Sequence, residues 1–330
     1  MITAKTSKTL RGIAILIVIA SHFAEWMFLE PAHPGLRHMI GTWGPPGVDI
    51  FLLLSGYGLY LSARKEAERT GAPGGITGHF VLRRLLNGIL PYYLIIGIAY
   101  FFTGTWKQAL QEGYLPDTLR AYLTATDHWY IQVLIVLYLA FILCFRFGGK
   151  FRLPLLSAAV ILHMILLANA DHADFWTLSN GAFLIGVYAA ALEKRFPEQL
   201  QSLRTRLAVL LAGAAGMTVT YLQMARLGGS GAPEAYGWEL AMNLCFTVIV
   251  LGAAWLLKDL PGLILPLLGE HSLFIYLTHT SVFWLLIFKL EALPYAAGAA
   301  LTALASIILS IAAGTVYSLI TKKLLSTSAR

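Results

Sequence analysis

The chain alternates long apolar segments with short polar connections along almost its whole length. Ten segments are long enough to cross a ~30 Å hydrocarbon layer as α-helices, because each helical residue adds ~1.5 Å. They lie at approximately residues 11–29, 48–63, 83–103, 128–145, 153–170, 177–193, 207–225, 240–257, 272–289 and 296–320. The pattern predicts an all-α, polytopic integral membrane protein with about ten transmembrane helices.

Composition supports this fold class. Hydrophobic residues make up 58% of the chain and charged residues only 12%, with a mean hydropathy of +0.69. A typical soluble domain carries about 25% charged residues. No linker rich in proline, glycine and serine divides the chain, so we expect residues 1–330 to form a single integral membrane domain with no fused soluble domain.

Basic residues indicate the topology. If the N-terminus is cytoplasmic, all but five of the 24 lysines and arginines fall on the cytoplasmic side. The five exceptions are Arg37, Lys107, Arg120, Arg226 and Lys289. This asymmetry predicts cytoplasmic N- and C-termini and a multi-pass protein of the cell (cytoplasmic or inner) membrane. It also accounts for the net charge of +7 through topology and membrane lipids, so we expect no nucleic-acid partner.

The first apolar segment carries two polar side chains on one helical face. Arg11 and His22 are eleven residues apart, and eleven steps of ~100° return to nearly the same direction. They are about 16 Å apart along the axis, so His22 lies near mid-membrane if Arg11 lies at the surface. A titratable side chain at that depth indicates a functional site.

Other ionisable groups lie near this pair in the predicted topology. Glu25 is one turn beyond His22 on the same face and could pair with its imidazole. Asp49, at the outer start of the second span, could orient His22 or an acceptor, or could only cap its helix. Arg83 and Arg84 open the third span at the inner surface. With Arg11 they could bind a polyphosphate ligand, or serve only as membrane-surface anchors.

Two further groups of polar and aromatic residues belong to apolar segments. His128, Trp129 and Tyr130 begin the fourth span, as an interfacial aromatic belt or as a platform for a carbohydrate acceptor. A polar stripe within the bundle would consist of Ser55, Ser272, Tyr276 and His279. The alternative for this stripe is buried side chains that only satisfy one another. The nine histidines form no obvious metal cluster, and we expect no metal cofactor.

At these residues the chain strongly resembles the acyltransferase-3 family of integral membrane O-acyltransferases. Five blocks occur in the family order: Arg-x10-His at Arg11 and His22; Gly-Val-Asp-x-Phe…Ser-Gly at Gly47, Val48, Asp49, Phe51, Ser55 and Gly56; Arg-Arg…Pro-Tyr at Arg83, Arg84, Pro91 and Tyr92; His-Trp at His128 and Trp129; and Ser-x-x-x-Tyr-Leu-x-His at Ser272, Tyr276, Leu277 and His279. The chain departs from the pattern at Asn87, where family members usually carry arginine. It also carries Gln132 and Leu134 where many members have a glutamate after the tryptophan.

The resemblance implies an O-acetyltransferase that uses acetyl-CoA as acyl donor and a glycan or lipid-linked sugar as acceptor. His22 would be the general base or a transient acyl carrier, with Asp49 and Glu25 as further catalytic groups. Arg11, Arg83 and Arg84 would bind the donor phosphates, and His128, Trp129 and Tyr130 the acceptor. A second transfer step would require a separate periplasmic or extracellular partner.

Two other classes compete with this interpretation. A proton-coupled secondary transporter or lipid-linked glycan exporter would use His22, Glu25 and Asp49 as a proton relay. A non-catalytic membrane scaffold would require all of these polar side chains to be packing groups.

Overall fold

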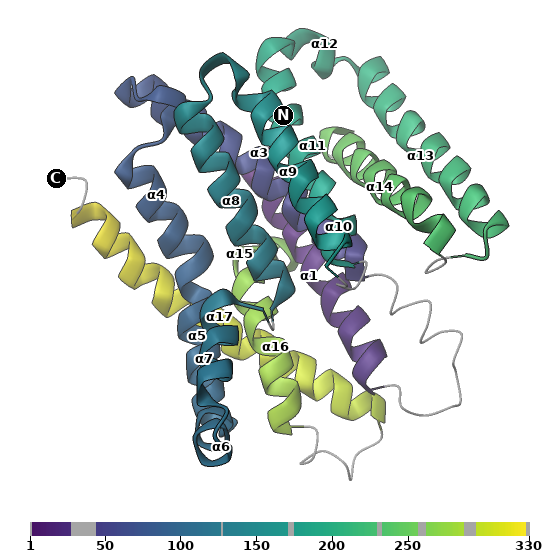
Figure 1. The fold of residues 1–330 in the computed structure, drawn as a ribbon. Coiled ribbons are helices and arrows are strands. Elements are labelled where there is room, and N and C mark those ends of the chain that lie inside the picture. Colours follow the sequence, from purple (N-terminus) through teal and green to yellow (C-terminus); the bar gives the residue numbers. More distant parts are fainter. Residues whose placement is uncertain are drawn as a thin grey trace.

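The structure is a computed structural model that describes residues 2–27, 44–126, 128–170, 175–229, 233–256, 262–286 and 295–327. Every regular element within these ranges is helical (Figure 1). The α-helices are α1 (Ala4–Met27), α3 (Gly44–Thr70), α4 (Gly78–Arg84), α5 (Leu90–Phe102), α6 (Thr105–Glu112), α7 (Leu115–Thr124), α8 (Trp129–Phe147), α9 (Arg152–Ala168), α10 (Phe175–Leu178), α11 (Asn180–Arg195), α12 (Pro197–Gln201), α13 (Leu203–Arg226), α14 (Tyr236–Leu256), α15 (Ile264–Glu270), α16 (Ser272–Leu286) and α17 (Tyr295–Thr327). Short 3₁₀ turns lie at Pro73–Gly75, Gly149–Phe151 and Pro233–Ala235, and a π-turn (Leu85–Ile89) joins α4 to α5.

Within the described ranges, 7 helical segments are long and apolar enough to cross a membrane, and Ser272–Phe283 forms a shorter apolar helix. The protein is therefore an all-α, polytopic membrane protein, as predicted. The remaining two predicted spans, 11–29 and 177–193, overlap α1 and α10–α11. The total of ten spans and the cytoplasmic termini stay predictions.

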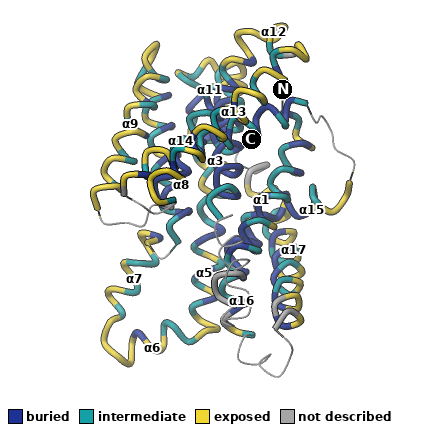
Figure 2. Tube along the Cα trace, turned by 90° about the vertical axis from the view of Figure 1, so that its right-hand side faces the viewer, coloured by how far each residue is buried: buried dark blue, intermediate teal, exposed yellow. Residues whose placement is uncertain are grey.

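Helix α3 forms the centre of the bundle. All residues from Gly47 to Leu54 are buried, and α3 packs against α1, α11 and α14. Two glycines allow close backbone approach to α11. A Cβ at Gly56 would lie 2.1 Å from the Phe183 carbonyl oxygen, and one at Gly186 would lie 2.0 Å from that of Leu53. In Figure 2 buried positions concentrate along α3, whereas α9, α6 and α7 carry many exposed ones.

Helix α1 connects this centre to the C-terminal part of the chain. It packs against α15 and α16, and α16 packs against α5 and α17. Lys8 on α1 forms an ion pair with Glu270 at the end of α15 (2.7 Å). The hydrogen bond from Lys8 lowers the pKa of the Glu270 carboxyl below its usual value. Both side chains are about half exposed, so the pair adds little stability, but it marks where α1 and α15 meet.

Candidate active site

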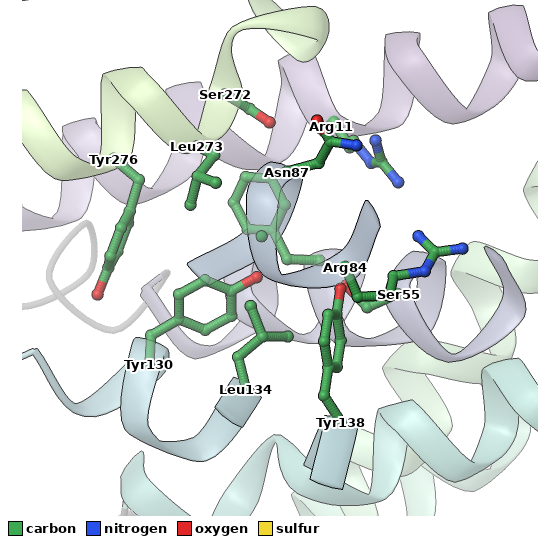
Figure 3. Close-up of a pocket in the computed structure, with 12 residues that line it drawn as sticks. Arg11, Ser55, Arg84, Asn87, Tyr130, Leu134, Tyr138, Ser272, Leu273 and Tyr276 are labelled. Carbon is green, nitrogen blue, oxygen red and sulfur yellow. The ribbon is translucent and has the colours of Figure 1, made fainter. Parts of the chain in front are cut away.

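A cavity of about 180 Å³ lies between α1, α3, α8, α16 and the junction of α4 and α5 (Figure 3). It is lined by Arg11, Phe51, Ser55, Arg84, Asn87, Gly88, Tyr130, Leu134, Tyr138, Ser272, Leu273 and Tyr276. Helices that are far apart in the sequence therefore bring predicted donor residues and predicted stripe residues around one space.

Pro91 explains the π-turn between α4 and α5, which forms one wall of the cavity. Proline has no N–H to donate to the Asn87 carbonyl, and its ring disfavours a regular helical turn there. The helix widens to a π-turn in which the Leu90 N–H bonds the Leu85 carbonyl. The Leu86 carbonyl accepts a hydrogen bond from the Tyr317 hydroxyl of α17 instead. Such turns are frequent at functional sites, and this one places Asn87 and Gly88 on the cavity wall.

Positive charge gathers at one side of the cavity, and no side chain in the described ranges neutralises it. Figure 3 shows the guanidinium groups of Arg11 and Arg84 on the same side, with the Tyr276 ring opposite. The guanidinium carbon of Arg84 lies over the Phe80 ring, 5.2 Å from its centroid, and its buried Nε makes no hydrogen bond with a described residue. Among the described residues, no carboxylate forms an ion pair with Arg11, Arg83 or Arg84. An anion is the group that this arrangement favours.

The structure separates the two adjacent arginines of α4. Arg84 is half-buried and lines the cavity, whereas Arg83 is exposed and does not. Arg83 nevertheless lies near enough for its charge to repel that of Arg84, as does Arg11.

His22 and His279 form a direct hydrogen bond. His22 Nδ1 lies 2.7 Å from His279 Nε2, and the two rings are within 5° of parallel. His279 Nδ1 lies 2.6 Å from the Tyr276 carbonyl oxygen and 3.1 Å from that of Ile275. Because carbonyls only accept, the hydrogen-bond network assigns a proton to His279 Nδ1. His279 Nε2 then accepts from the His22 Nδ1–H, and the lone pair of neutral His22 is on Nε2.

Tyr276 connects the cavity with this histidine pair. Its ring lines the cavity, 5.0 Å from the Tyr130 ring and 5.8 Å from the His279 ring. Ser272, Tyr276 and His279 belong to α16 at spacings of four and three, which gives them a common side of the helix. His22 is about 16 Å from Arg11 along the unbroken helix α1.

Asp49 makes no hydrogen bond with either histidine of the pair. Helix α3 begins at Gly44, so the alternative in which Asp49 caps the helix start is wrong. The carboxylate is buried, and neither oxygen makes a hydrogen bond with another described residue, although the Ser179 hydroxyl lies beside it. His22 is hydrogen-bonded to His279, whereas Asp49 makes no hydrogen bond with His22. The side chain of Glu25 lies outside the described residues, and a catalytic role for either acid stays a prediction.

The predicted acceptor residues face different neighbours. The His128 ring contacts that of Tyr92, with centroids 5.2 Å apart. Trp129 contacts Trp176 (6.3 Å). Tyr130 instead lines the cavity with the arginines, which places it beside the predicted donor residues.

Sequence reasoning missed Leu134 and Tyr138 on the cavity wall and the pairing of His279 with His22. The signal for the first two was present, because Tyr130, Leu134 and Tyr138 are spaced by four and share one face of α8. In the described ranges, no group of three His, Cys, Asp or Glu side chains is placed to hold a metal ion.

Long apolar helices packed around a polar cavity define the class, a multi-pass membrane protein. The sequence profile of acyltransferase family 3, described as an acyltransferase domain, matches residues 8–319. The chain therefore belongs to the acyltransferase-3 family, as the sequence blocks predicted, and is an enzyme that transfers acyl groups other than aminoacyl groups. Neither a search of curated proteins nor a search of solved structures found a match.

Proposed function

We propose that this enzyme transfers an acetyl group from cytoplasmic acetyl-CoA to a hydroxyl of a glycan or lipid-linked sugar at the cell membrane. The observation that carries the proposal is that one cavity has two arginines, which form no ion pair with a described carboxylate, on one side. On its other side lies a tyrosine that contacts a hydrogen-bonded histidine pair. Arg11 and Arg84 lie at one side of the cavity, and Tyr276 connects its other side with His279 and His22.

The arginines suit the phosphates of a coenzyme A donor. The cavity of about 180 Å³ is below the ~300–1,000 Å³ of pockets that enclose a whole drug-sized ligand. It would take only the slender arm of the donor, with the nucleotide outside, where Arg83 is exposed. The acyl end would then extend about 16 Å along α1, from the level of Arg11 to that of His22.

His22 would act through Nε2. As general base, Nε2 takes the proton of the acceptor hydroxyl while the hydroxyl oxygen forms a bond to the thioester carbonyl carbon. The carbon–sulfur bond then breaks, and the imidazolium returns the proton to the departing thiolate. As acyl carrier, the same lone pair would attack the thioester carbon, and the carbon–sulfur bond would break to release the thiolate of CoA. The acceptor oxygen would then attack the acyl-imidazole, the acyl–nitrogen bond would break, and the hydroxyl proton would go to the thiolate. In either role His279 holds the His22 ring and its tautomer in place.

Sidedness distinguishes this enzyme from the competing transporter. Radiolabelled acetyl-CoA is supplied to one side of vesicles that contain the protein in one orientation, with a glycan acceptor on the opposite side. We expect label to become covalently attached to the glycan only when donor is on the side of Arg11, with free CoA remaining there. Movement of an intact solute without covalent label would contradict the proposed function. Transport of CoA across the membrane would contradict the route of the donor.

A further inference from the structure

A second cavity, of about 190 Å³, lies at the end of the bundle that carries the N-terminus of α1. Its walls come from the end of α3, the turn before α4, and the connection between α8 and α9. The lining residues that matter are Tyr60, Arg64, Glu68, Gly74, Phe145 and Arg152, and none of them lines the first cavity.

Tight packing builds the apolar wall of this second cavity. Phe145 is buried, stacks on Phe141 with centroids 3.9 Å apart, and meets the edge of Tyr60 at 6.0 Å. Gly74 has a φ of 61°, and a Cβ there would lie 1.9 Å from the Phe145 carbonyl oxygen. The turn can approach α8 this closely only because residue 74 is glycine. The cavity is therefore framed by backbone and packed rings.

One guanidinium in this second cavity has no counter-charge among the described side chains. Arg64 is paired with Glu68 (2.8 Å), whereas no described carboxylate forms an ion pair with Arg152. The guanidinium carbon of Arg152 lies over the Phe145 ring, 5.2 Å from its centroid. A cation–π contact of this kind engages the charge of the guanidinium and gives none of its N–H groups a hydrogen-bond acceptor atom. Those groups match the oxygens of a phosphate.

The helix that begins at Arg152 indicates the source of the phosphate. Leu155, Leu162 and Leu166 share one face of α9 and are 47%, 56% and 60% exposed. In a membrane protein this face contacts acyl chains. Arg152 is one turn from Leu155, so a headgroup at Arg152 would be continuous with chains lying along α9.

We propose that the second cavity binds the phosphate of a phospholipid, with Arg152 as the principal ligand and the acyl chains along α9. Arg64 contributes less because Glu68 neutralises it. The site is separate from the cavity that we assign to acetyl-CoA and does not depend on that assignment.

Purified protein in a neutral detergent would be titrated with phosphatidylglycerol, with bound lipid counted by native mass spectrometry. We expect Arg152→Gln to weaken binding about tenfold or more, as for loss of a charge-assisted hydrogen bond. Lys150→Gln is the matched control, because Lys150 is a nearby cation outside the cavity lining, and it should bind like the wild type. Glu68→Gln should tighten binding, since it removes the carboxylate that neutralises Arg64. That variant also tests the proposal if Arg152→Gln fails to fold.

Several results would overturn the lipid site. One is equal binding by Arg152→Gln and wild type, and another is equal weakening by Lys150→Gln. Glu68→Gln binding no tighter than wild type is a third. Competition by inorganic phosphate at the same concentration as the lipid would assign the cavity to a free anion. A higher KM for acetyl-CoA in Arg152→Gln, with lipid binding unchanged, would assign it to the donor.

Discussion

Replacing His22 with alanine should lower the rate of acetyl transfer by about 10²- to 10⁴-fold, the usual contribution of a positioned general base. The reason is the tautomer that the network assigns, in which Nε2 of His22 carries the lone pair. Alanine leaves the acceptor hydroxyl without a proton acceptor at that position. Release of CoA thiol and formation of acetylated glycan by purified protein would be measured together.

His163→Ala is the matched control for this experiment. His163 is also a histidine in an apolar helix, α9, but it does not belong to the histidine pair, and its buried Nε2 makes no hydrogen bond with a described residue. We expect this variant to insert and to transfer acetyl groups like the wild type. His22→Ala should also insert normally. If properly inserted His22→Ala formed acetylated product at the wild-type rate, His22 would have no part in the chemistry.

Neutralising Arg84 or Arg11 with glutamine should raise the KM for acetyl-CoA by about 10- to 100-fold, as expected for a lost charge-assisted contact to phosphate. The KM for the acceptor should change much less, because both arginines lie at the proposed donor side of the cavity. Initial rates with each substrate varied in turn would separate the two effects.

Arg83→Gln provides the comparison, since Arg83 is adjacent in sequence but exposed and outside the cavity lining. Its effect on the KM for acetyl-CoA should be smaller than that of Arg84→Gln. Asn87→Arg would add a cation to the cavity wall and should leave the KM for the donor unchanged or lower it. Equal changes in the KM values of both substrates for Arg84→Gln would indicate a structural role for Arg84.

The fold class and the shared face of Arg11 and His22 could be predicted because they depend on local regularity. Apolar segment length predicts spanning helices, and α1 is an unbroken helix over both residues. The family could be predicted because its sequence blocks are ordered along the chain. Each of these inferences needs only the period of a helix or the order of motifs.

The rotation of each helix in the bundle could not be predicted. Adjacent helical residues point ~100° apart, and their order in the sequence does not decide which of Arg83 and Arg84, or of Trp129 and Tyr130, lines the cavity. The choice depends on packing with neighbouring helices and, for Arg84, on the π-turn beside Pro91. For Arg83 and Arg84 the sequence carries no local signal for that rotation, whereas on α8 the spacing of Tyr130, Leu134 and Tyr138 was such a signal.

The pairing of His22 with His279 was also beyond prediction. His279 is 257 residues away in the chain, and the pair forms only because α1 packs against α16. As the partner of His22, the spacing along the helix favoured Glu25, one turn away. Asp49 at the start of the second span was the other predicted candidate. Pairing between distant helices is a tertiary property, and one sequence contains no direct record of it.

The central claim is that His22 and His279 act as one unit, and a double-mutant cycle tests it most directly. His279→Ala alone should slow acetyl transfer by about 10- to 100-fold, typical for loss of a residue that orients a functional group. His279→Gln, whose side-chain oxygen can accept the His22 hydrogen bond, should restore part of the loss. The variant carrying both His22→Ala and His279→Ala should be no slower than His22→Ala alone, because groups that act as a unit are strongly non-additive. A double variant slower by the product of the two single losses would show that the histidines act independently and would contradict the account.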